Sequence, residues 1–501
     1  MSNLAIVYSR AQKGIDAPLV RVEVHLSAGL PGLSIVGLAE TAVKESKDRV
    51  RAAIINSNLD FPQRRITINL SPADLPKEGG RFDLPIAIGI LAASKQVSSD
   101  RLAETEFIGE LSLSGDLHPV KGVLPVAIKA EEHNRVLVVP KENGSEAALI
   151  KSSVTKTANN LLEICAWLNQ VDELDLAKVV NEKEKIQIAD LSDVKGQSQA
   201  KRALEIAACG GHNLLFIGPP GTGKTMLASR LPGILPQLTE KQSLETAAVA
   251  SISGRGFDVA NWGLPPFRQT HHTASAVSLV GGGSNPQPGE ISLSHEGVLF
   301  LDELPEFSRH VLEVLREPIE SGKITISRAT KQVDFPARFQ LIAAMNPCPC
   351  GYLGDKDREC LCSQVQIERY RAKISGPLLD RIDMHVEVAR IPYKQLRLNS
   401  ENSESSNEIK ARVVVAREAQ LKRNNGKPNA QLGNKEMELL LQISEKNLIL
   451  LESIVEKLKL SARAYHRILK ISRTIADLDS SFTIEKNHVL EAISYRCLDR
   501  S

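Results

Sequence analysis

Residues 218–225 read Gly218-Pro-Pro-Gly-Thr-Gly-Lys224-Thr225, and this stretch decides the fold. It follows the apolar run Asn-Leu-Leu-Phe-Ile at 213–217 and precedes Met-Leu-Ala-Ser-Arg-Leu at 226–231, which is typical of a helix. In a strand, glycine-rich turn and helix, backbone N–H groups face a polyphosphate, Lys224 reaches the β- and γ-phosphates, and Thr225 ligates Mg²⁺. The sequence therefore predicts that ATP or GTP is bound by Gly218, Pro219, Pro220, Gly221, Thr222, Gly223, Lys224 and Thr225.

A second motif follows about eighty residues later, where the run Val-Leu-Phe-Leu at 298–301 ends in Asp302 and Glu303. An uninterrupted apolar run is typical of a strand buried on both faces of a parallel sheet, and ligands bind at the carboxyl ends of such strands. Asp302 would hold Mg²⁺, and Glu303 would orient and deprotonate the attacking water. The two motifs together predict hydrolysis of the bound nucleotide.

A third apolar run, Gln-Leu-Ile-Ala-Ala-Met at 340–345, ends in Asn346. At the carboxyl end of a buried strand, the Asn346 amide could hold the attacking water or the γ-phosphate. An asparagine that only caps a strand before a proline fits the same pattern.

Arg381 lies within the stretch Ser-Gly-Pro-Leu-Leu-Asp-Arg-Ile-Asp at 375–383. Its guanidinium could enter the ATP site of a neighbouring subunit and stabilise charge on the transferring phosphoryl group. The alternative is a local salt bridge to Asp380 or Asp383.

The composition is that of an ordinary globular protein. A chain of 501 residues is too long for one hydrophobic core and predicts about three or four domains. The net charge of +2 does not indicate a surface that coats nucleic acid, so contact with DNA would need a local basic patch. The apolar run 84–93 is too short to span a bilayer, and residues 1–10 do not form a signal peptide. We expect a cytoplasmic protein with no membrane contact.

Four of the seven cysteines are clustered. Cys348 and Cys350 form one Cys-x-Cys pair, and Cys360 and Cys362 form a second, with nine residues between the pairs. In a reducing compartment this pattern favours a thiolate zinc site over disulfides, although the spacing is not that of a common zinc knuckle. Four free or redox-active thiols are the alternative. Either arrangement would stiffen a loop near the ATP site.

Two polar stretches divide the chain, and the second of them is Asn-Ser-Glu-Asn-Ser-Glu-Ser-Ser-Asn at 399–407. Before them, residues 19–25 and 65–70 alternate apolar and polar residues as strands do; after them, residues 443–460 and 465–478 have helical apolar spacing. The predicted organisation is an N-terminal domain at 1–171, a linker at 172–189, a nucleotide-binding core at 190–395 and a helical lid at 396–501.

The motifs GPPGTGKT, VLFLDE, AAMNP and SGPLLDRID, in this order, resemble the AAA+ ATPases of the magnesium-chelatase type, in the clade with a helix-2 insert and a β-hairpin before sensor 1. Across essentially the whole chain, the sequence resembles the ComM/YifB family. The further marks are PFRQTHHTAS at 266–275, PGEISL at 288–293 and LPEF at 304–307. The implied fold class is α/β, with an AAA+ P-loop NTPase core.

The resemblance also implies residue roles and an activity. Asn346 takes the position of sensor 1, Arg381 that of the finger acting on a neighbouring subunit, and Arg463 that of sensor 2, with Arg467 one turn later as the competing position. Similar proteins are hexameric, helicase-like motors that drive branch migration of DNA joints during natural transformation. The implied partners are branched or single-stranded DNA, further copies of the chain, and a recombinase or other recombination proteins.

Two segments could contact DNA. Residues 320–328 predict a strand-turn-strand placed like the hairpin that lines the pore in this clade, with Lys323 and Arg328 as its basic residues. Six copies in a ring would concentrate this weak patch, although an ordinary surface hairpin fits as well. The insert 269–283 is polar and glycine-ended, and we expect His271 and His272 to point to opposite faces of a strand and to bind no metal.

The N-terminal domain resembles the proteolytic domain of Lon, which has a ribosomal-protein-like α+β fold. The matching strings are PKEGGRFD at 76–83 and GELSLSG at 109–115. Lon-type proteases need a serine and a lysine, and these positions hold Arg81 and Leu124, so we expect a scaffold or DNA-binding accessory domain. The rival functions are a magnesium-chelatase-type motor that remodels a protein partner, and an ATP-dependent protease.

Overall fold

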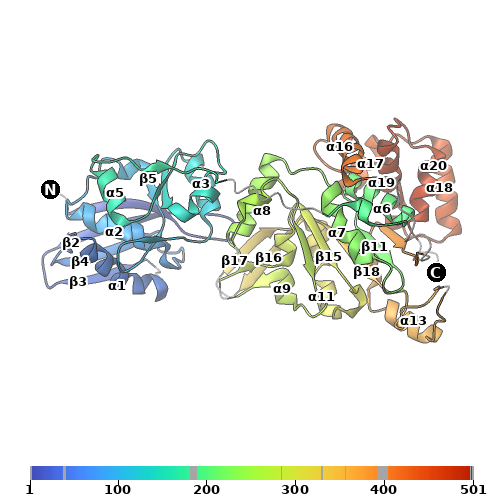
Figure 1. Cartoon of the computed structure of the whole chain (residues 1–501), viewed down its shortest axis with the longest axis horizontal. Coiled ribbons are helices and arrows are strands. Elements are labelled where there is room, and N and C mark those ends of the chain that lie inside the picture. The colour runs from blue at the N-terminus through green and yellow to red at the C-terminus, as the bar shows by residue number, and fades with distance from the viewer. Residues whose placement is uncertain are drawn as a thin grey trace. The chain divides into compact units, whose positions relative to one another are not determined.

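The computed structural model describes residues 3–37, 41–180, 189–254, 256–283, 285–328, 331–355, 357–391, 404–496 and 498 (Figure 1). The chain forms two compact units. Unit 1 comprises Met1–Lys185 and Ala247–Trp262, and unit 2 comprises Ile186–Thr246 and Gly263–Ser501. Within the described residues, no helix is long and apolar enough to cross a membrane.

Unit 1 is built on a mixed eight-stranded sheet with the order β10-β9-β8-β5-β1-β2-β4-β3, and β6 pairs with β7 beside it. Its strands are β1 (Leu4–Arg10), β2 (Leu19–Ser27), β3 (Gly32–Val36), β4 (Arg65–Ser71), β5 (Thr105–Phe107), β6 (Glu110–Leu111), β7 (Leu117–His118), β8 (Val136–Pro140), β9 (Thr155–Ala158) and β10 (Asp175–Leu176). Its helices are α1 (Thr41–Asn56), α2 (Asp83–Ala93), α3 (Val123–Glu132), α4 (Gly144–Ala147) and α5 (Leu161–Leu168).

The apolar run at 84–93 is the central helix of this unit. Every residue of α2 is buried, and the helix packs on β1 and β2. The contact is close at Gly89, where an added Cβ would lie 2.5 Å from the Val24 Cγ2 atom. The predicted strands at 19–25 and 65–70 are confirmed as β2 and β4, whose alternate residues face this core.

Unit 2 has an α/β core around a five-stranded sheet in which all neighbouring strands are parallel, in the order β12-β15-β18-β11-β19. Its strands are β11 (Leu214–Ile217), β12 (Phe267–Thr270), β13 (Gly281–Gly282), β14 (Gln287–Pro288), β15 (Gly297–Leu301), β16 (Lys323–Arg328), β17 (Lys331–Pro336), β18 (Phe339–Met345) and β19 (Met384–Glu387). The core helices are α6 (Ser198–Gly210), α7 (Lys224–Ile234), α8 (Glu240–Ser251), α9 (Ala276–Val280), α10 (Glu290–Leu293), α11 (Arg309–Glu313), α12 (Arg316–Ser321), α13 (Gln364–Arg371) and α14 (Gly376–Leu379).

Residues 404–496 form helices that complete unit 2 and are drawn in orange and red in Figure 1. They are α16 (Ser406–Arg423), α17 (Asn434–Leu440), α18 (Glu445–Lys457), α19 (Ala462–Leu478) and α20 (Lys486–Ser494). The predicted helical spans at 443–460 and 465–478 are confirmed as α18 and α19. Apolar side chains of α16 and α19 belong to the same core cluster as those of β11 and β18, so this region is joined to the sheet through one continuous core.

The boundaries differ from the expected ones in three places. The expected linker at 172–189 begins inside unit 1, because β10 pairs with β9 through backbone hydrogen bonds; residues 181–188 lie outside the described part. In the second polar stretch, 399–403 also lie outside it, and α16 already begins at Ser406. Residues 247–262 of the expected core belong to unit 1.

Candidate functional site

The sheet of unit 2 brings three of the sequence motifs to one edge. Strand β11 lies between β18 and β19, and β15 lies on the other side of β18. Because these strands are parallel, Gly218, Asp302 and Asn346 follow their carboxyl ends at the same edge of the sheet. The three predicted strands are thereby confirmed, and the arrangement is that of a nucleotide site.

The phosphate loop is closed around Lys224, which is the first residue of α7. The Lys224 side chain is buried, and the residue is 8% exposed. Its Nζ donates to the carbonyl oxygens of Gly218 at 2.7 Å and Pro219 at 2.9 Å, and to Asn346 Oδ1 at 3.1 Å. Burial lowers the pKa of Lys224 to about 8, against the carboxylates of Asp302 and Glu303, which raise it. The ammonium is therefore already held where phosphate oxygens would replace carbonyl oxygens as its partners.

Two glycines of the loop are needed for its shape. Gly221 and Gly223 have φ values of 77° and 88°, which other residues rarely adopt. At Gly218, an added Cβ would lie 2.2 Å from the carbonyl oxygen of Val388, so this position excludes a side chain. The glycines of the motif therefore serve both the turn and the close packing beneath it.

The acidic residues after β15 lie against the start of α7. The hydroxyl of Thr225 donates to Asp302 Oδ2 at 2.6 Å, and the backbone N–H of Glu303 donates to Asp302 Oδ1 at 2.9 Å. These oxygens suit Mg²⁺, which prefers hard oxygen ligands. Glu303 has a left-handed backbone with φ 53°, and its side chain is 51% exposed. Such a conformation in a non-glycine residue is typical of functional sites.

His272 contacts Glu303, and this contact was not predicted from the sequence. Strand β12 pairs with β15, and two residues beyond its end His272 Nδ1 lies 3.2 Å from Glu303 Oε2. The rings of His271 and His272 are 4.1 Å apart, so the expectation that they point to opposite faces is wrong. The reason is that β12 ends at Thr270 and the two histidines lie in a turn.

We expect His272→Ala to lower ATP turnover about two- to fivefold, because the imidazole orients Glu303 through a partly exposed contact worth up to about 1 kcal/mol. His271→Ala is the matched control, since His271 interacts with Thr273 and not with the carboxylate. Steady-state hydrolysis at saturating ATP would check this. Equal rates for the two variants would contradict a positioning role.

Arg381 follows α14 and is buried. Its Nη2 atom lies 2.7 Å from Glu320 Oε1, and its Nη1 atom donates to the carbonyl oxygen of Pro377 at 2.6 Å. Among the described residues, Arg381 forms no salt bridge to Asp380 or Asp383, and its ion pair is with Glu320 on α12. The guanidinium borders an open cavity of 490 Å³ that is also lined by Glu313, Arg316, Glu317, Glu320 and Ser321.

The two arginines considered for sensor 2 lie on α19 beside the same segment. Arg467 forms an ion pair with the buried Asp383, and burial lowers its pKa to about 10. Arg463 is 61% exposed and lies 3.6 Å from Asp380. Both arginines therefore meet the stretch that carries Arg381, and of the two Arg467 is the more firmly held.

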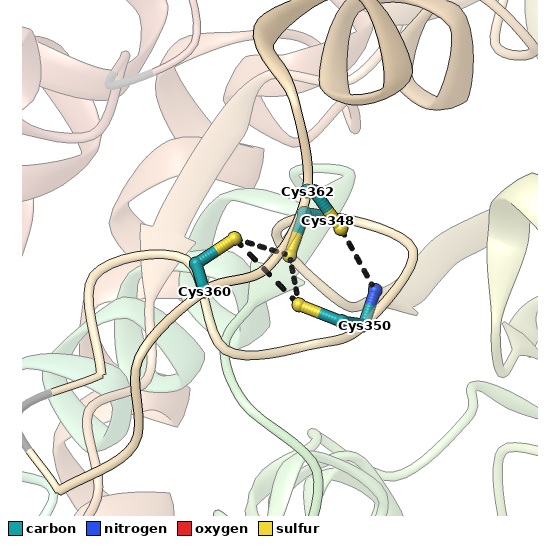
Figure 2. Close-up of side chains that lie close together, drawn as sticks. All are labelled: Cys348, Cys350, Cys360 and Cys362. Atoms are coloured by element: carbon teal, nitrogen blue, oxygen red, sulfur yellow. Dashed lines mark hydrogen bonds between the residues drawn. The ribbon is translucent and has the colours of Figure 1, made fainter.

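The four clustered cysteines come together in the loop between β18 and α13, as Figure 2 shows. The Cys348 and Cys350 sulfurs are 3.4 Å apart, and each lies 3.6 Å from the Cys360 sulfur. The four ligand atoms, with Cys362 included, all lie within 4.8 Å of one another. The predicted cluster is therefore present, and its size is compatible with a metal ion.

The basic hairpin differs from the expected one. Residues 323–328 form the single strand β16, which pairs with β17, so the predicted strand-turn-strand within 320–328 is wrong. Lys323 is exposed at the base of this hairpin, opposite Pro336. Arg328 ends β16, where it pairs with Lys331, and its side chain lies outside the described part of the chain.

In unit 1, Arg81 and Leu124 occupy the positions that the Lon resemblance assigns to a serine and a lysine. The Nη2 atom of Arg81 donates to Gln12 Oε1 at 2.9 Å and to the Lys121 carbonyl oxygen at 2.7 Å. Burial lowers the pKa of Arg81 to about 10. Leu124 is completely buried in α3. Both side chains hold the unit together, and neither offers a nucleophile or a base.

The comparisons with known families cover most of the chain. Models described as "Magnesium chelatase, subunit ChlI", "Subunit ChlI of Mg-chelatase" and "Magnesium chelatase, subunit ChlI C-terminal" match residues 190–396, 22–143 and 403–496. Together with the phosphate loop and the acidic motif, these matches define the class as magnesium-chelatase-like AAA+ ATPases.

The full-length relatives narrow the class to a family. The "Competence protein ComM" of Haemophilus influenzae is 51% identical, over 99% of this chain and 98% of its own. The "Uncharacterized protein YifB" of Escherichia coli is 50% identical with the same coverage. The "Magnesium-chelatase subunit ChlI-2, chloroplastic" of Arabidopsis thaliana is 21% identical, over 48% of this chain and 57% of its own. The chain belongs to the ComM/YifB family.

Proposed function

We propose that this protein is an ATP-dependent DNA motor that assembles as a homo-hexamer and drives branch migration of recombination intermediates in natural transformation. The observation that carries the proposal is that Lys224 meets Asn346 and Thr225 meets Asp302 at one sheet edge, in a chain that matches a protein named for competence along its whole length. The cofactors are ATP and Mg²⁺, with zinc as a structural ion at the four cysteines. The site of action is the cytoplasm.

The position of Arg381 supports assembly. Lys224, Thr225 and Asp302 contact one another or Asn346 at the sheet edge, whereas the guanidinium of Arg381 meets Glu320 and the carbonyl oxygen of Pro377. Arg381 precedes β19, so it lies at the opposite edge of the parallel sheet from its own phosphate loop, and it lines an open cavity. This position suits delivery to the ATP site of the next subunit. A ring of such contacts is a heterologous assembly that closes on itself.

In this proposal, the helices of 404–496 act as the lid and Arg463 or Arg467 as sensor 2. Unit 1 has the ribosomal-protein-like fold of the Lon proteolytic domain and serves as a scaffold or DNA-binding accessory. Protease activity is disfavoured because Arg81 and Leu124 replace the nucleophile and its base.

The deciding experiment measures branch migration and unwinding of synthetic DNA. The purified protein, ATP and Mg²⁺ are incubated with a four-way junction or a forked duplex, and released strands are separated by electrophoresis. We expect ATP-dependent release that Glu303→Gln abolishes. Hydrolysis that DNA does not stimulate, with intact junctions, would favour the second function: a magnesium-chelatase-type motor that remodels a protein partner. The similarity to magnesium-chelatase subunits is what favours that alternative.

We propose further that Lys323 and Arg328 of the β16–β17 hairpin contact DNA phosphates, which predicts how DNA affinity depends on salt. Replacing Lys323 and Arg328 together by alanine removes phosphate contacts, so the log-log slope of DNA affinity against salt should fall by about 0.7–0.9 per lost contact. Lys457→Ala, which removes an exposed charge from α18, is the matched control and should leave the slope unchanged. Equal slopes for the double variant and the wild-type protein, with the oligomer intact, would place the DNA path elsewhere.

A further inference from the structure

The cysteine loop has the dimensions of a tetrahedral thiolate site. Zinc–sulfur bonds of about 2.3 Å place the sulfurs of a tetrahedral site about 3.8 Å apart. Three sulfurs of the cluster form a triangle with sides of 3.4 Å, 3.6 Å and 3.6 Å. These separations exceed the sulfur–sulfur bond of a disulfide, about 2.05 Å. The Cys362 sulfur lies next to this triangle, in reach of the same ion.

A backbone N–H group of the loop points at one of the sulfurs. The N–H of Cys350 lies 3.4 Å from the Cys362 sulfur, and Figure 2 shows this contact closing the loop. Such donors stabilise coordinating thiolates and fix their orientation. Four soft sulfur ligands within 4.8 Å of one another suit zinc, which binds four cysteine thiolates in structural sites.

The cysteine loop also touches the ATP site. Gly351 has a φ of 85°, and an added Cβ there would lie 2.8 Å from Pro220 Cδ in the phosphate loop and 3.9 Å from Asn346 Cγ. Cys348 is two residues beyond Asn346, whose side chain accepts from Lys224. An ion bound by the cysteines would therefore fix the distance between Asn346 and the phosphate loop.

We propose that Cys348, Cys350, Cys360 and Cys362 bind one zinc ion that holds Asn346 and the phosphate loop in their working positions. The metal site stands on the cysteine geometry alone, whereas its effect on turnover rests on the proposed ATPase function. Loss of the ion releases the loop between β18 and α13 without removing any residue that contacts phosphate.

The metal is tested first, on the full-length protein purified under reducing conditions. Elemental analysis is expected to give about one zinc per chain, and Co²⁺ in its place should give the visible spectrum of a tetrahedral thiolate site. Cys360→Ser should lose the ion, whereas Cys360→His should keep it, because three cysteines and one histidine also form a zinc site. Cys165→Ala, which removes a buried thiol of α5, should keep it too. A reduced wild-type protein that binds neither metal, or that holds iron instead, would overturn the zinc assignment.

The coupling is tested by comparing the two Cys360 variants. Cys360→Ser should lower kcat/KM for ATP about 10- to 100-fold, because misplacement of about 1 Å has effects of this size, and Cys360→His should restore most of it. Circular dichroism and thermal melting establish that both variants are folded. A folded, zinc-free variant with the wild-type kcat/KM and the wild-type affinity for a fluorescent ATP analogue would refute the coupling. A wild-type protein that hydrolyses no ATP would refute the proposed function, and the metal content and analogue affinity would still decide this inference.

Discussion

Lys224→Ala is expected to bind ATP at least about 100-fold more weakly than the wild-type protein, whereas Glu303→Gln is expected to bind ATP normally and to hydrolyse it about 10²- to 10⁴-fold more slowly. The loss of binding and the loss of hydrolysis fall on different variants because the two residues lie in different places. Lys224 is enclosed by the phosphate loop, whereas Glu303 follows β15 and has a half-exposed carboxylate. Charge–phosphate contacts are lost in the first variant. In the second, only the base that activates water is lost.

Binding is measured with a fluorescent ATP analogue and turnover by phosphate release. Glu306→Gln is the matched control for the second variant, because Glu306 is three residues away and forms a surface ion pair with Lys373. It should hydrolyse ATP at close to the wild-type rate. Glu303→Gln turning over ATP as fast as Glu306→Gln would show that another group acts as the base.

The parts of the site that the sequence predicted are those encoded locally. The phosphate loop, the apolar run before Asp302 and the run before Asn346 each combine a short periodic pattern with a functional residue at a fixed offset, and each forms the expected strand or turn. The clustering of the four cysteines was predictable for the same reason. Two Cys-x-Cys pairs joined by a turn can meet whatever the rest of the fold does.

The parts that the sequence did not predict depend on pairing between distant segments. The contact of His272 with Glu303 exists because β12 lies beside β15, and neither motif contains that information. The partner of Arg381 was misjudged because the nearby acids in the sequence, Asp380 and Asp383, were considered, whereas the structure provides Glu320 from another helix. The hairpin was misplaced because 323–328 all belong to β16, whose partner strand begins at Lys331, and basic residues alone do not locate the end of a strand.

The N-terminal boundaries show the same limit. Composition predicted a linker from residue 172, but Asp175 and Leu176 add an edge strand whose only requirement is backbone hydrogen bonding to β9. Both side chains are exposed, so no apolar pattern marks the strand. Strands of this kind cannot be found by hydrophobic periodicity.

Arg381→Ala is expected to lower ATP hydrolysis about 10³-fold and to regain activity when mixed with Lys224→Ala, which is inactive by itself. In a mixed ring, an Arg381→Ala subunit contributes an intact phosphate loop and its Lys224→Ala neighbour contributes an intact Arg381. With random mixing in equal amounts, about a quarter of the interfaces combine the two, so activity should recover to about a quarter of the wild-type value. Subunit exchange is followed separately by fluorescence energy transfer between labelled variants.

Glu320→Gln distinguishes the arginine finger from a structural ion pair. Glu320 is 60% exposed, so its contact with Arg381 is worth about 1 kcal/mol or less, and this variant should lose no more than about fivefold in turnover. The guanidinium remains available to the neighbouring site in this variant and is absent in Arg381→Ala. If the ion pair were the function of Arg381, the two variants would be equally impaired and mixing would restore neither. Suppose that subunits exchange, that Arg381→Ala stays inactive in the mixture, and that Glu320→Gln loses as much ATP hydrolysis as Arg381→Ala. The proposal of a shared ATP site would then be wrong, because hydrolysis at a shared site depends on the guanidinium of Arg381 and not on Glu320, its partner within the subunit.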